Sequence, residues 1–538
     1  MKKRLGLLLF IYSTLLFATA KPPKLVVQIV VDQLRGDLID LYHREFSADG
    51  FNYLLAHGLD FHNAHYPQAN TVTCVGHATL ATGAYPSFHG IVANEWHDSR
   101  NGATYCVDDL QNPILKTSRT QKEAMGKSPK NLVASTLSDE IVLAQSGRAF
   151  AVSLKDRAAI TLAGHAGKAF WFDKLNGGFV TSKHYYSAYP QWVIDWNQHY
   201  ESKSLTWTLS HPLDYYHYAK APRFINRYPG FEQNFPHQTG PANSKHYYKF
   251  LSMTPFADEL TADFAIDLLA QEKLGKNKDS TDYLALSFSA VDAVGHQFGP
   301  NSLESEDNLL RLDKVLAKLL TAIDKQVGLE NTLIILTADH GVSDSPAYLT
   351  THKIRENTSL KIPQLRKLIE ESLAKHYHLP ASSLEAIITP YIYLNHQLLA
   401  EHHLTVKQVS LFLAELLTKQ AGIFKVYQIP LANKESDWLS AKVNKMVFPG
   451  RSGDLYLVPY PFGALDNKNK QRVSHGTPWR YDSYVPLLFV NPSFKAQRIY
   501  KPVNITDVAP TLAALLQIKA PSAAFGKPLQ EVLNQFDI

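Results

Sequence analysis

The stretch LVVQIVVD at residues 25–32 decides the fold class of this 538-residue chain. Its near-continuous run of β-branched and other apolar residues is typical of a strand buried on both faces, as in a parallel sheet. Similar runs occupy residues 149–154, 283–289 and 332–337, and leucines at helical spacing lie between the last two. This alternation predicts an α/β fold with a mostly parallel central sheet flanked by helices.

Acidic and histidine side chains follow these strands at or just past their carboxyl ends. Asp32 ends the first run, Asp292 lies just past the third, and Asp339 and His340 lie just past the fourth. Because open α/β sheets gather ligands at this edge, we expect these side chains to lie close together in space. Taken singly, each would be an ordinary helix cap or turn residue.

Two more histidines complete a set of metal-ligand types. His296 lies four residues after Asp292, a spacing that lets both side chains point at one metal ion. His475 lies in the loop SHGTP at residues 474–478, where the glycine suits the presentation of a ligand. Three carboxylates and three imidazoles shared between two ions fit zinc with oxygen and nitrogen ligands.

A candidate nucleophile lies in the stretch NTVTCVGHATLATG at residues 70–83. Turn-like residues lead there into a short helix-compatible run, so the Thr73 hydroxyl is expected near a helix N-terminus, where an anion is favoured. A threonine hydroxyl holds its proton at neutral pH, but a bound metal ion stabilises the alkoxide. Without metal ligands elsewhere in the chain, this stretch would be an ordinary capped helix.

These blocks together resemble the alkaline phosphatase superfamily, from Val27 to about Leu516. Within it the chain is most similar to the PafA-type phosphate-irrepressible enzymes, which share fold and bimetallic core with nucleotide pyrophosphatase/phosphodiesterases. The matching blocks are VDQ (31–33), TCVGH (73–77), DAVGH (292–296), TADHG (337–341) and SHG (474–476). The resemblance implies one zinc ion held by Asp292, His296 and His475, and a second held by Asp32, Asp339 and His340, with Thr73 as nucleophile and ligand.

Three further residues match the phosphate-contacting groups of this subfamily. Asn94, in GIVANE at residues 90–95, matches the position of its phosphate-contacting Asn. Lys155 and Arg157, in SLKDR at residues 153–157, resemble its Lys-x-Arg pair. On a strand, positions i and i+2 point the same way, so both cations would reach one anion, Arg as a bidentate fork and Lys as a point charge. Outside this context the pair would be a solvated strand end.

The implied reaction is zinc-dependent hydrolysis of small-molecule phosphate monoesters through a covalent phosphothreonine at Thr73. The alternative is a phosphodiesterase or nucleotide pyrophosphatase that uses the same two metal ions. A phosphoryl-group transferase and a non-catalytic exported zinc- or phosphate-binding protein are further alternatives. The chain departs from many alkaline phosphatases in having Thr instead of Ser and no clear magnesium triad. Residues 74–78 do not match the Cys/Ser-x-Pro-x-Arg motif of sulfatases.

The first twenty residues predict export. A basic start, a mostly apolar run and the small residues at 18–20 are typical of a secretory signal, although an N-terminal anchor is the alternative. We therefore expect a periplasmic or secreted protein with no stable membrane insertion after cleavage. The formal net charge of +5 gives no reason to expect a nucleic-acid partner.

Residues 21–538 are expected to form one catalytic domain with insertions near 165–255 and 345–470. Export permits a disulfide between Cys74 and Cys106, but the sequence gives no distance and leaves the bond open. The natural substrate, the role of the insertions, the oligomeric state and the metal loaded in the cell are also left open.

Overall fold

The computed structural model describes residues 22–100, 102–120, 125–222, 228–354, 360–431, 436–466 and 473–536. The predicted signal at residues 1–20 lies outside the described residues. A nine-stranded sheet has the order β21-β2-β20-β12-β1-β11-β6-β7-β8. In that order the strands span Gln497–Ile499, Gly58–Phe61, Leu487–Val490, Thr332–Thr337, Leu25–Val31, Asp282–Phe288, Ala149–Ser153, Lys168–Phe172 and Phe179–Val180.

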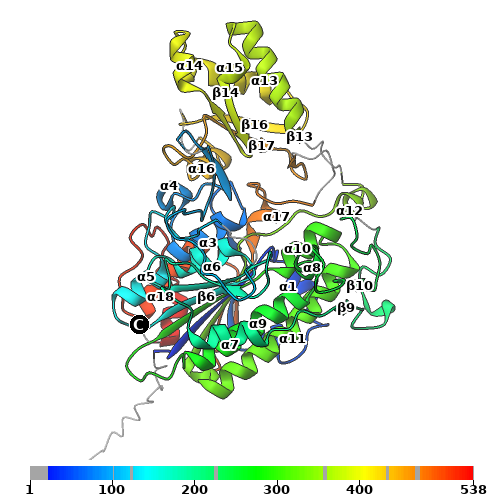
Figure 1. Ribbon diagram of the computed structural model, residues 1–538, viewed down its shortest axis with the longest axis vertical. Helices are drawn as coiled ribbons and strands as arrows, with labels where there is room; N and C mark the ends of the chain where they lie inside the picture. The colour runs from blue at the N-terminus through cyan, green and yellow to red at the C-terminus, as the bar shows by residue number, and fades with distance from the viewer. Residues whose placement is uncertain are drawn as a thin grey trace, which may run out of the picture.

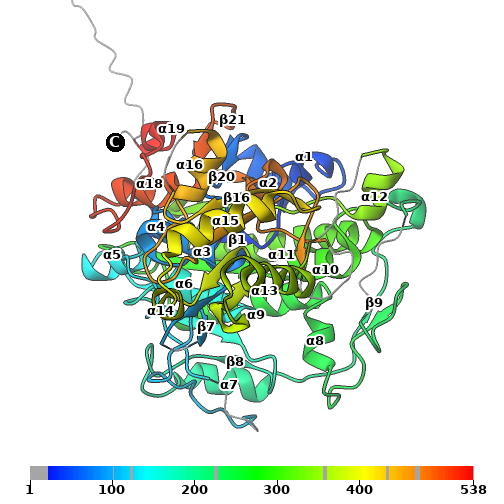
Figure 2. The same ribbon diagram turned by 90° about the horizontal axis from the view of Figure 1, so that it is seen from above.

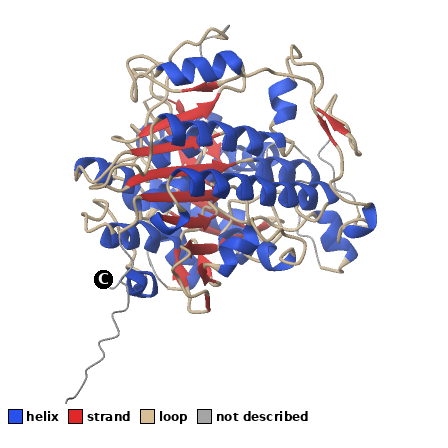
Figure 3. Cartoon of the chain, turned by 90° about the horizontal axis from the view of Figure 1, so that it is seen from below, coloured by secondary structure: helices blue, strands red, loops and turns tan. Residues whose placement is uncertain are grey.

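The predicted α/β fold is confirmed. Five neighbouring strands pair in parallel, in the order β12, β1, β11, β6 and β7. Strand β1 lies between β12 and β11, and every residue of β1 is buried. Helices pack on the sheet in two groups that Figure 1 shows on either side of the strands. One group is α3, α5, α6 and α18 (Thr73–Thr82, Leu137–Leu143, Asp156–Ala163, Val508–Leu515), and the other includes α9 and α11 (Phe256–Gln271, Leu303–Gln326). Figure 3 shows the strands as a stack through the middle of the body.

The apolar stretch at residues 484–490 forms two strands because Pro486 interrupts it. Proline has no N–H to donate to a ladder, so it separates strand segments. Here β19 (Tyr484–Val485) pairs with β3 (Ala64–His65), while β20 pairs antiparallel with β12 and β2 in the main sheet. The sheet is therefore parallel in its centre and mixed towards one edge.

A second lobe stands above the carboxyl edge of the main sheet (Figure 1). Its sheet has the order β14-β15-β17-β16 (Leu384–Ile388, Tyr391–Leu394, Leu455–Pro459, Ile423–Gln428), and all neighbouring pairs are antiparallel. Helices α13 (Ile362–Tyr377) and α15 (Val406–Thr418) cover it and share a separate apolar core with its strands. Seen from above, the lobe projects over the middle of the body (Figure 2). That residues 165–255 and 345–470 are insertions stays a prediction.

Two further features bear on the sequence-based expectations. Cys74 and Cys106 are joined by a disulfide, which links α3 to the chain just after β5 (Gly102–Tyr105). Within the described part of the chain, no helix has both the length and the apolar character needed to span a bilayer.

Candidate active site

The carboxyl edge of the central strands brings the predicted acidic residues together. Asp32 directly follows β1, and its backbone N–H donates to the carbonyl of Phe288 at the end of β11. Asp339 follows β12 by two residues, and Asp292 lies in the first turn of α10 (Ala290–Phe298), just past β11. All three carboxylates are buried, so the sheet topology places three acids in one interior region.

Two clusters of these side chains have the composition of a metal site. The ligand atoms of Asp32, Asp339 and His340 lie within 4.8 Å of one another, and so do those of Asp292, His340 and His475. His340 thus belongs to both clusters, which the sequence did not indicate. His296 stands beside the second cluster, with its Nε2 atom 3.0 Å from Asp292 Oδ1 and its ring 5.2 Å from that of His475.

The three histidines share one tautomeric arrangement. The Nδ1 atoms of His340, His475 and His296 lie 2.9, 2.9 and 3.0 Å from the backbone carbonyls of Gly341, Thr71 and Val473. A carbonyl only accepts, so Nδ1 carries the proton and Nε2 presents a lone pair in the neutral ring. Metal-binding histidines are commonly oriented by such a bond through the other nitrogen.

Unpaired atoms in the first cluster fit a bound cation. Asp32 Oδ1, Asp339 Oδ2 and His340 Nε2 are buried and have no hydrogen-bond partner, although Nε2 lies 3.4 and 3.3 Å from the two oxygens. Buried polar atoms are normally paired, so three converging unpaired ligand atoms need an explanation. Carboxylate oxygen and imidazole nitrogen are ligand types that zinc accepts, so this donor set fits the implied metal.

Electrostatics in the first cluster favour an ionised Asp339 and a neutral His340. Burial and the neighbouring Asp339 raise the pKa of Asp32 to about 7. Burial also opposes ionisation of Asp339, but His340 and His77 hold its pKa below the usual value. Burial lowers the pKa of His340 to about 3. His340 is therefore neutral at physiological pH, as a metal ligand must be.

Thr73 occupies the start of α3, as predicted from the sequence. It is the first residue of the helix, after Val72 in an extended conformation, and is 2% exposed. Arg157 Nη2 donates to its Oγ1 at 3.3 Å. The free N–H groups and positive dipole end of α3 favour negative charge here, so the hydroxyl oxygen lies where an alkoxide is stabilised.

Asn94 lies against the same helix start. Its Oδ1 accepts the backbone N–H of Cys74 at 2.9 Å, and its own carbonyl accepts the N–H of Cys106 at 2.9 Å. The disulfide between these cysteines fastens the Asn94 segment to α3. Because Oδ1 is engaged as an acceptor, the Nδ2 donor is the end of the amide left to face a ligand.

Lys155 and Arg157 are brought to the site, but not by the strand geometry predicted for them. Strand β6 ends at Ser153, Lys155 precedes α6, and Arg157 lies in the first helical turn. The local reason is that Ser153 Oγ accepts the Lys155 N–H and Asp156 Oδ1 accepts the Arg157 N–H, which turns the chain into the helix.

The ammonium group of Lys155 bridges the two clusters. Its Nζ lies 2.5 Å from Asp32 Oδ2 and 2.6 Å from Asp292 Oδ2. Burial lowers the pKa of Lys155, but Asp292 and Asp32 outweigh it and hold the pKa above its usual value. Lys155 is therefore a charged group placed between candidate metal ligands, a contact that the sequence did not predict.

Three residues that received no role from the sequence contact these groups. His77 Nδ1 lies 2.9 Å from the Thr73 carbonyl and 3.3 Å from Asp339 Oδ2. Tyr105 accepts from Arg157 Nη1 at 3.3 Å. Gln33 bonds to Asp292 and Asp339. The sequence could have indicated His77 and Gln33, because both lie inside the blocks that match the superfamily. Tyr105 lies outside those blocks, so no sequence pattern pointed to it.

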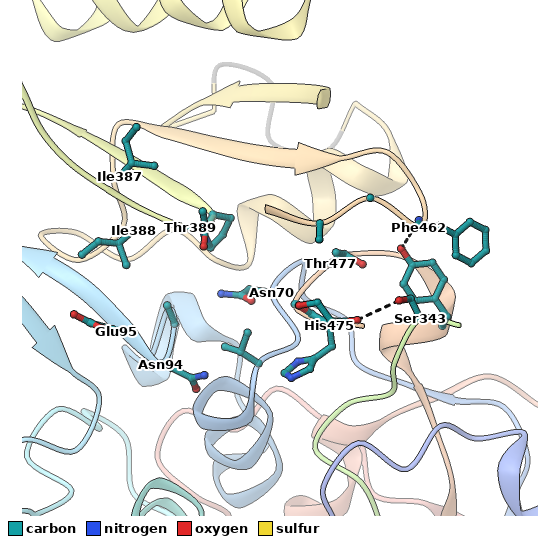
Figure 4. A pocket seen from close by; sticks show the side chains of 18 residues that line it. Asn70, Asn94, Glu95, Ser343, Ile387, Ile388, Thr389, Phe462, His475 and Thr477 are labelled. Carbon is teal, nitrogen blue, oxygen red and sulfur yellow. Dashed lines mark hydrogen bonds between the residues drawn. The ribbon is translucent and has the colours of Figure 1, made fainter. Parts of the chain in front are cut away.

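A cavity of about 460 Å³ lies between the body and the second lobe. Figure 4 shows Asn94 and His475 on the body side and Ile387, Ile388 and Thr389 opposite them, on the side of the lobe. His475 is shared by this cavity and the second cluster. The cavity therefore offers space for a ligand directly beside the candidate metal ligands.

Comparison with known proteins agrees with this architecture. Residues 26–478 match the family described as Type I phosphodiesterase / nucleotide pyrophosphatase. The chain belongs to this family. Alkaline phosphatase PafA of Elizabethkingia meningoseptica is 33% identical, with 95% of both chains covered. Alkaline phosphatase PhoV of Synechococcus elongatus is also 33% identical, with 96% of this chain and 94% of the relative covered.

A solved structure extends the similarity to the whole fold. The crystal structure of wild-type alkaline phosphatase PafA is 31% identical, has a TM-score of 0.84, and covers 95% of this chain and 99% of that one. These similarities confirm the resemblance to PafA-type alkaline phosphatases that the sequence blocks indicated. The chain is a phosphoester hydrolase of the alkaline phosphatase type.

Proposed function

We propose that this family member hydrolyses phosphate monoesters with two zinc ions and a covalent phosphothreonine. The observation that carries the proposal is the pair of clusters in which histidine Nε2 atoms lie near carboxylates, together with Thr73, whose carbonyl contacts the same His77 nitrogen as Asp339 does. One ion would be held by Asp292, His296 and His475, and the other by Asp32, Asp339, His340 and Thr73. When bound, zinc would supply Lewis acidity for the attacking and leaving oxygens.

The chain's own residues would hold the nucleophile and the transferred group. Thr73 Oγ1 gives its proton to water and attacks phosphorus as the alkoxide from the start of α3, where the free N–H groups favour negative charge. The bond from phosphorus to the ester oxygen breaks, and the leaving alkoxide takes a proton from water. Arg157, already bonded to Thr73 Oγ1, with Lys155 and the Nδ2 of Asn94, would bind the non-bridging oxygens. Water then cleaves phosphothreonine, giving inorganic phosphate and the free hydroxyl.

A test that separates the alternatives uses purified, zinc-loaded protein and three matched esters. We expect an aryl phosphate to be hydrolysed faster than its methyl diester, and the aryl sulfate to be the poorest substrate. Acid-quenched enzyme should carry phosphate on Thr73 during monoester turnover. Preference for the diester would favour the phosphodiesterase. Phosphoryl transfer to an added alcohol in place of water would favour the transferase. No turnover of any ester would leave the non-catalytic binding protein as the alternative.

We also propose that the protein is exported to the periplasm or secreted. The Cys74–Cys106 disulfide supports this, because disulfides persist in oxidising compartments. Cell fractionation with sequencing of the mature N-terminus tests the proposal, and a cytoplasmic protein that retains residues 1–20 would contradict it.

A further inference from the structure

Gln33 occupies an unusual backbone conformation between the two clusters. It directly follows Asp32 at the end of β1, is 1% exposed, and has φ of 71°. This left-handed conformation is uncommon for a residue other than glycine, and such residues concentrate at functional sites. The turn it makes directs its main chain and its side chain to different carboxylates.

Gln33 contacts one acid of each cluster. Its backbone N–H donates to Asp339 Oδ1 at 3.2 Å, and its side-chain Nε2 donates to Asp292 Oδ1 at 2.8 Å. A carboxylate accepts only, so the nitrogen end of the amide must face Asp292. With Lys155 on Oδ2, the Gln33 bond fixes the rotation of the Asp292 carboxylate and leaves its remaining Oδ1 lone pair towards His296 and His475.

The helix that carries Asp292 is shaped to accept this side chain. Gly295 lies between Asp292 and His296 on α10, and a Cβ atom there would stand 2.1 Å from Gln33 Oε1. The three nearest atoms to that position all belong to Gln33. Glycine at this place therefore provides the notch in which the amide of Gln33 lies.

We propose that Gln33 is a positioning residue that orients Asp292 in one metal site through its side chain and Asp339 in the other through its backbone. The inference rests on the two-ion site of the proposed function. In this role Gln33 acts through Asp292 and Asp339 and does not bind the substrate itself. Its two bonds are separable, because a change of side chain leaves the backbone N–H in place.

The first experiment deletes the side chain and keeps the backbone. Glycine tolerates the positive φ, so Gln33→Gly keeps the backbone bond to Asp339 and removes the side chain with its bond to Asp292. Loss of a group that orients a metal ligand typically weakens metal affinity by about 10- to 100-fold. We expect Gln33→Gly to weaken one zinc equivalent by about that factor and to leave the other within a few-fold, as measured by competition with a chromophoric chelator. Gln33→Met, which keeps the length, should behave likewise.

The matched control is Gln28→Met, since Gln28 is also a buried amide on β1, but its Nε2 donates to no hydrogen-bond partner among the described residues. It should bind both ions as the wild type does. Melting of the metal-free proteins reports folding separately from metal affinity. Wild-type affinity for both ions in Gln33→Gly would overturn the inference, whereas a wild type that binds no zinc would overturn the proposed function.

A second experiment uses the notch. Gly295→Ala should displace the Gln33 amide and weaken the same ion, although alanine itself favours a helix over glycine. In the Gln33→Gly background the clash is gone, so Gly295→Ala should produce no further loss of affinity. Equal losses in both backgrounds would show that the notch serves something other than Gln33 and would overturn this part of the proposal.

Discussion

Lys155 Nζ lies 2.6 Å from Asp292 Oδ2, inside the protein and between the two clusters of candidate metal ligands. The same ammonium group also pairs with Asp32. Two buried carboxylates close together repel each other, and a shared cation compensates both. In the metal-free protein, Lys155 therefore supplies part of the positive charge that two zinc ions would supply in the loaded enzyme.

The first prediction follows from this charge compensation. Lys155→Met should destabilise the metal-free protein by roughly 3–5 kcal/mol, the usual loss when a buried ion pair is broken from one side. The zinc-loaded protein should lose less, because the ions compensate the same carboxylates. Urea unfolding with and without zinc measures both values.

Lys127→Met is a suitable control for that measurement. Lys127 also bridges two carboxylates, at 2.6 Å from Asp108 and 3.3 Å from Asp156, but lies outside both clusters. Its loss should destabilise both forms of the protein equally. If Lys155→Met did the same, the ammonium group would not be compensating the metal ligands.

The second prediction concerns the nucleophile. Thr73→Ala should abolish the phosphoenzyme, while Thr73→Ser should retain part of the turnover, since serine keeps the hydroxyl at the start of α3. Mass spectrometry of acid-quenched enzyme identifies the modified residue. Phosphate found on any other side chain would show that Thr73 is wrongly assigned.

The third prediction concerns the metal. The purified enzyme should contain two zinc ions per chain, and a chelator should abolish its activity until zinc is returned. Each ion should also stabilise the fold by about 2.7 kcal/mol at a free concentration 100-fold above its Kd. Elemental analysis and melting curves check both statements. Full turnover by a preparation verified to be metal-free would refute the two-zinc mechanism.

The order of strands and acids explains why so much of the site could be predicted. Near-continuous apolar runs report burial on both faces, and parallel strands gather their carboxyl ends at one edge. Asp32, Asp292 and Asp339 each follow such a run, so their meeting follows from topology alone. Asp32 and Asp292 meet at this edge although about 260 residues separate them along the chain.

Other features depend on contacts that sequence periodicity does not report. Apolarity at residues 484–490 indicates burial but not the partner strand, and Pro486 then divides the stretch. Lys155 and Arg157 were expected on a strand, yet hydrogen bonds from neighbouring side chains start a helix there. The sharing of His340 by both clusters and the position of the second lobe arise from tertiary packing, which no local pattern encodes.

The fourth prediction concerns the disulfide. It closes a loop of 32 residues, which the chain-entropy relation converts to roughly 3–4 kcal/mol of stability. The double substitution Cys74→Ser, Cys106→Ser should lower the free energy of unfolding by about that amount. Monoester hydrolysis should also slow, because the bond fastens Asn94 to the start of α3. Two free thiols in denatured, unreduced protein from the periplasm would contradict the bond itself.

The fifth prediction separates monoesterase from diesterase. A monoester dianion presents three non-bridging oxygens, whereas a diester presents two and carries less charge. Removal of one preorganised donor typically slows a reaction by on the order of 10²–10³. Arg157→Ala and Lys155→Ala should therefore reduce kcat/KM for an aryl phosphate by about that factor, and for its methyl diester by much less. Both cations lie at the start of α6, where Arg157 bonds to Thr73 and Lys155 bonds to Asp292. Equal losses on both esters would mean that the pair supports the metal sites or the fold, and that selectivity for monoesters arises elsewhere.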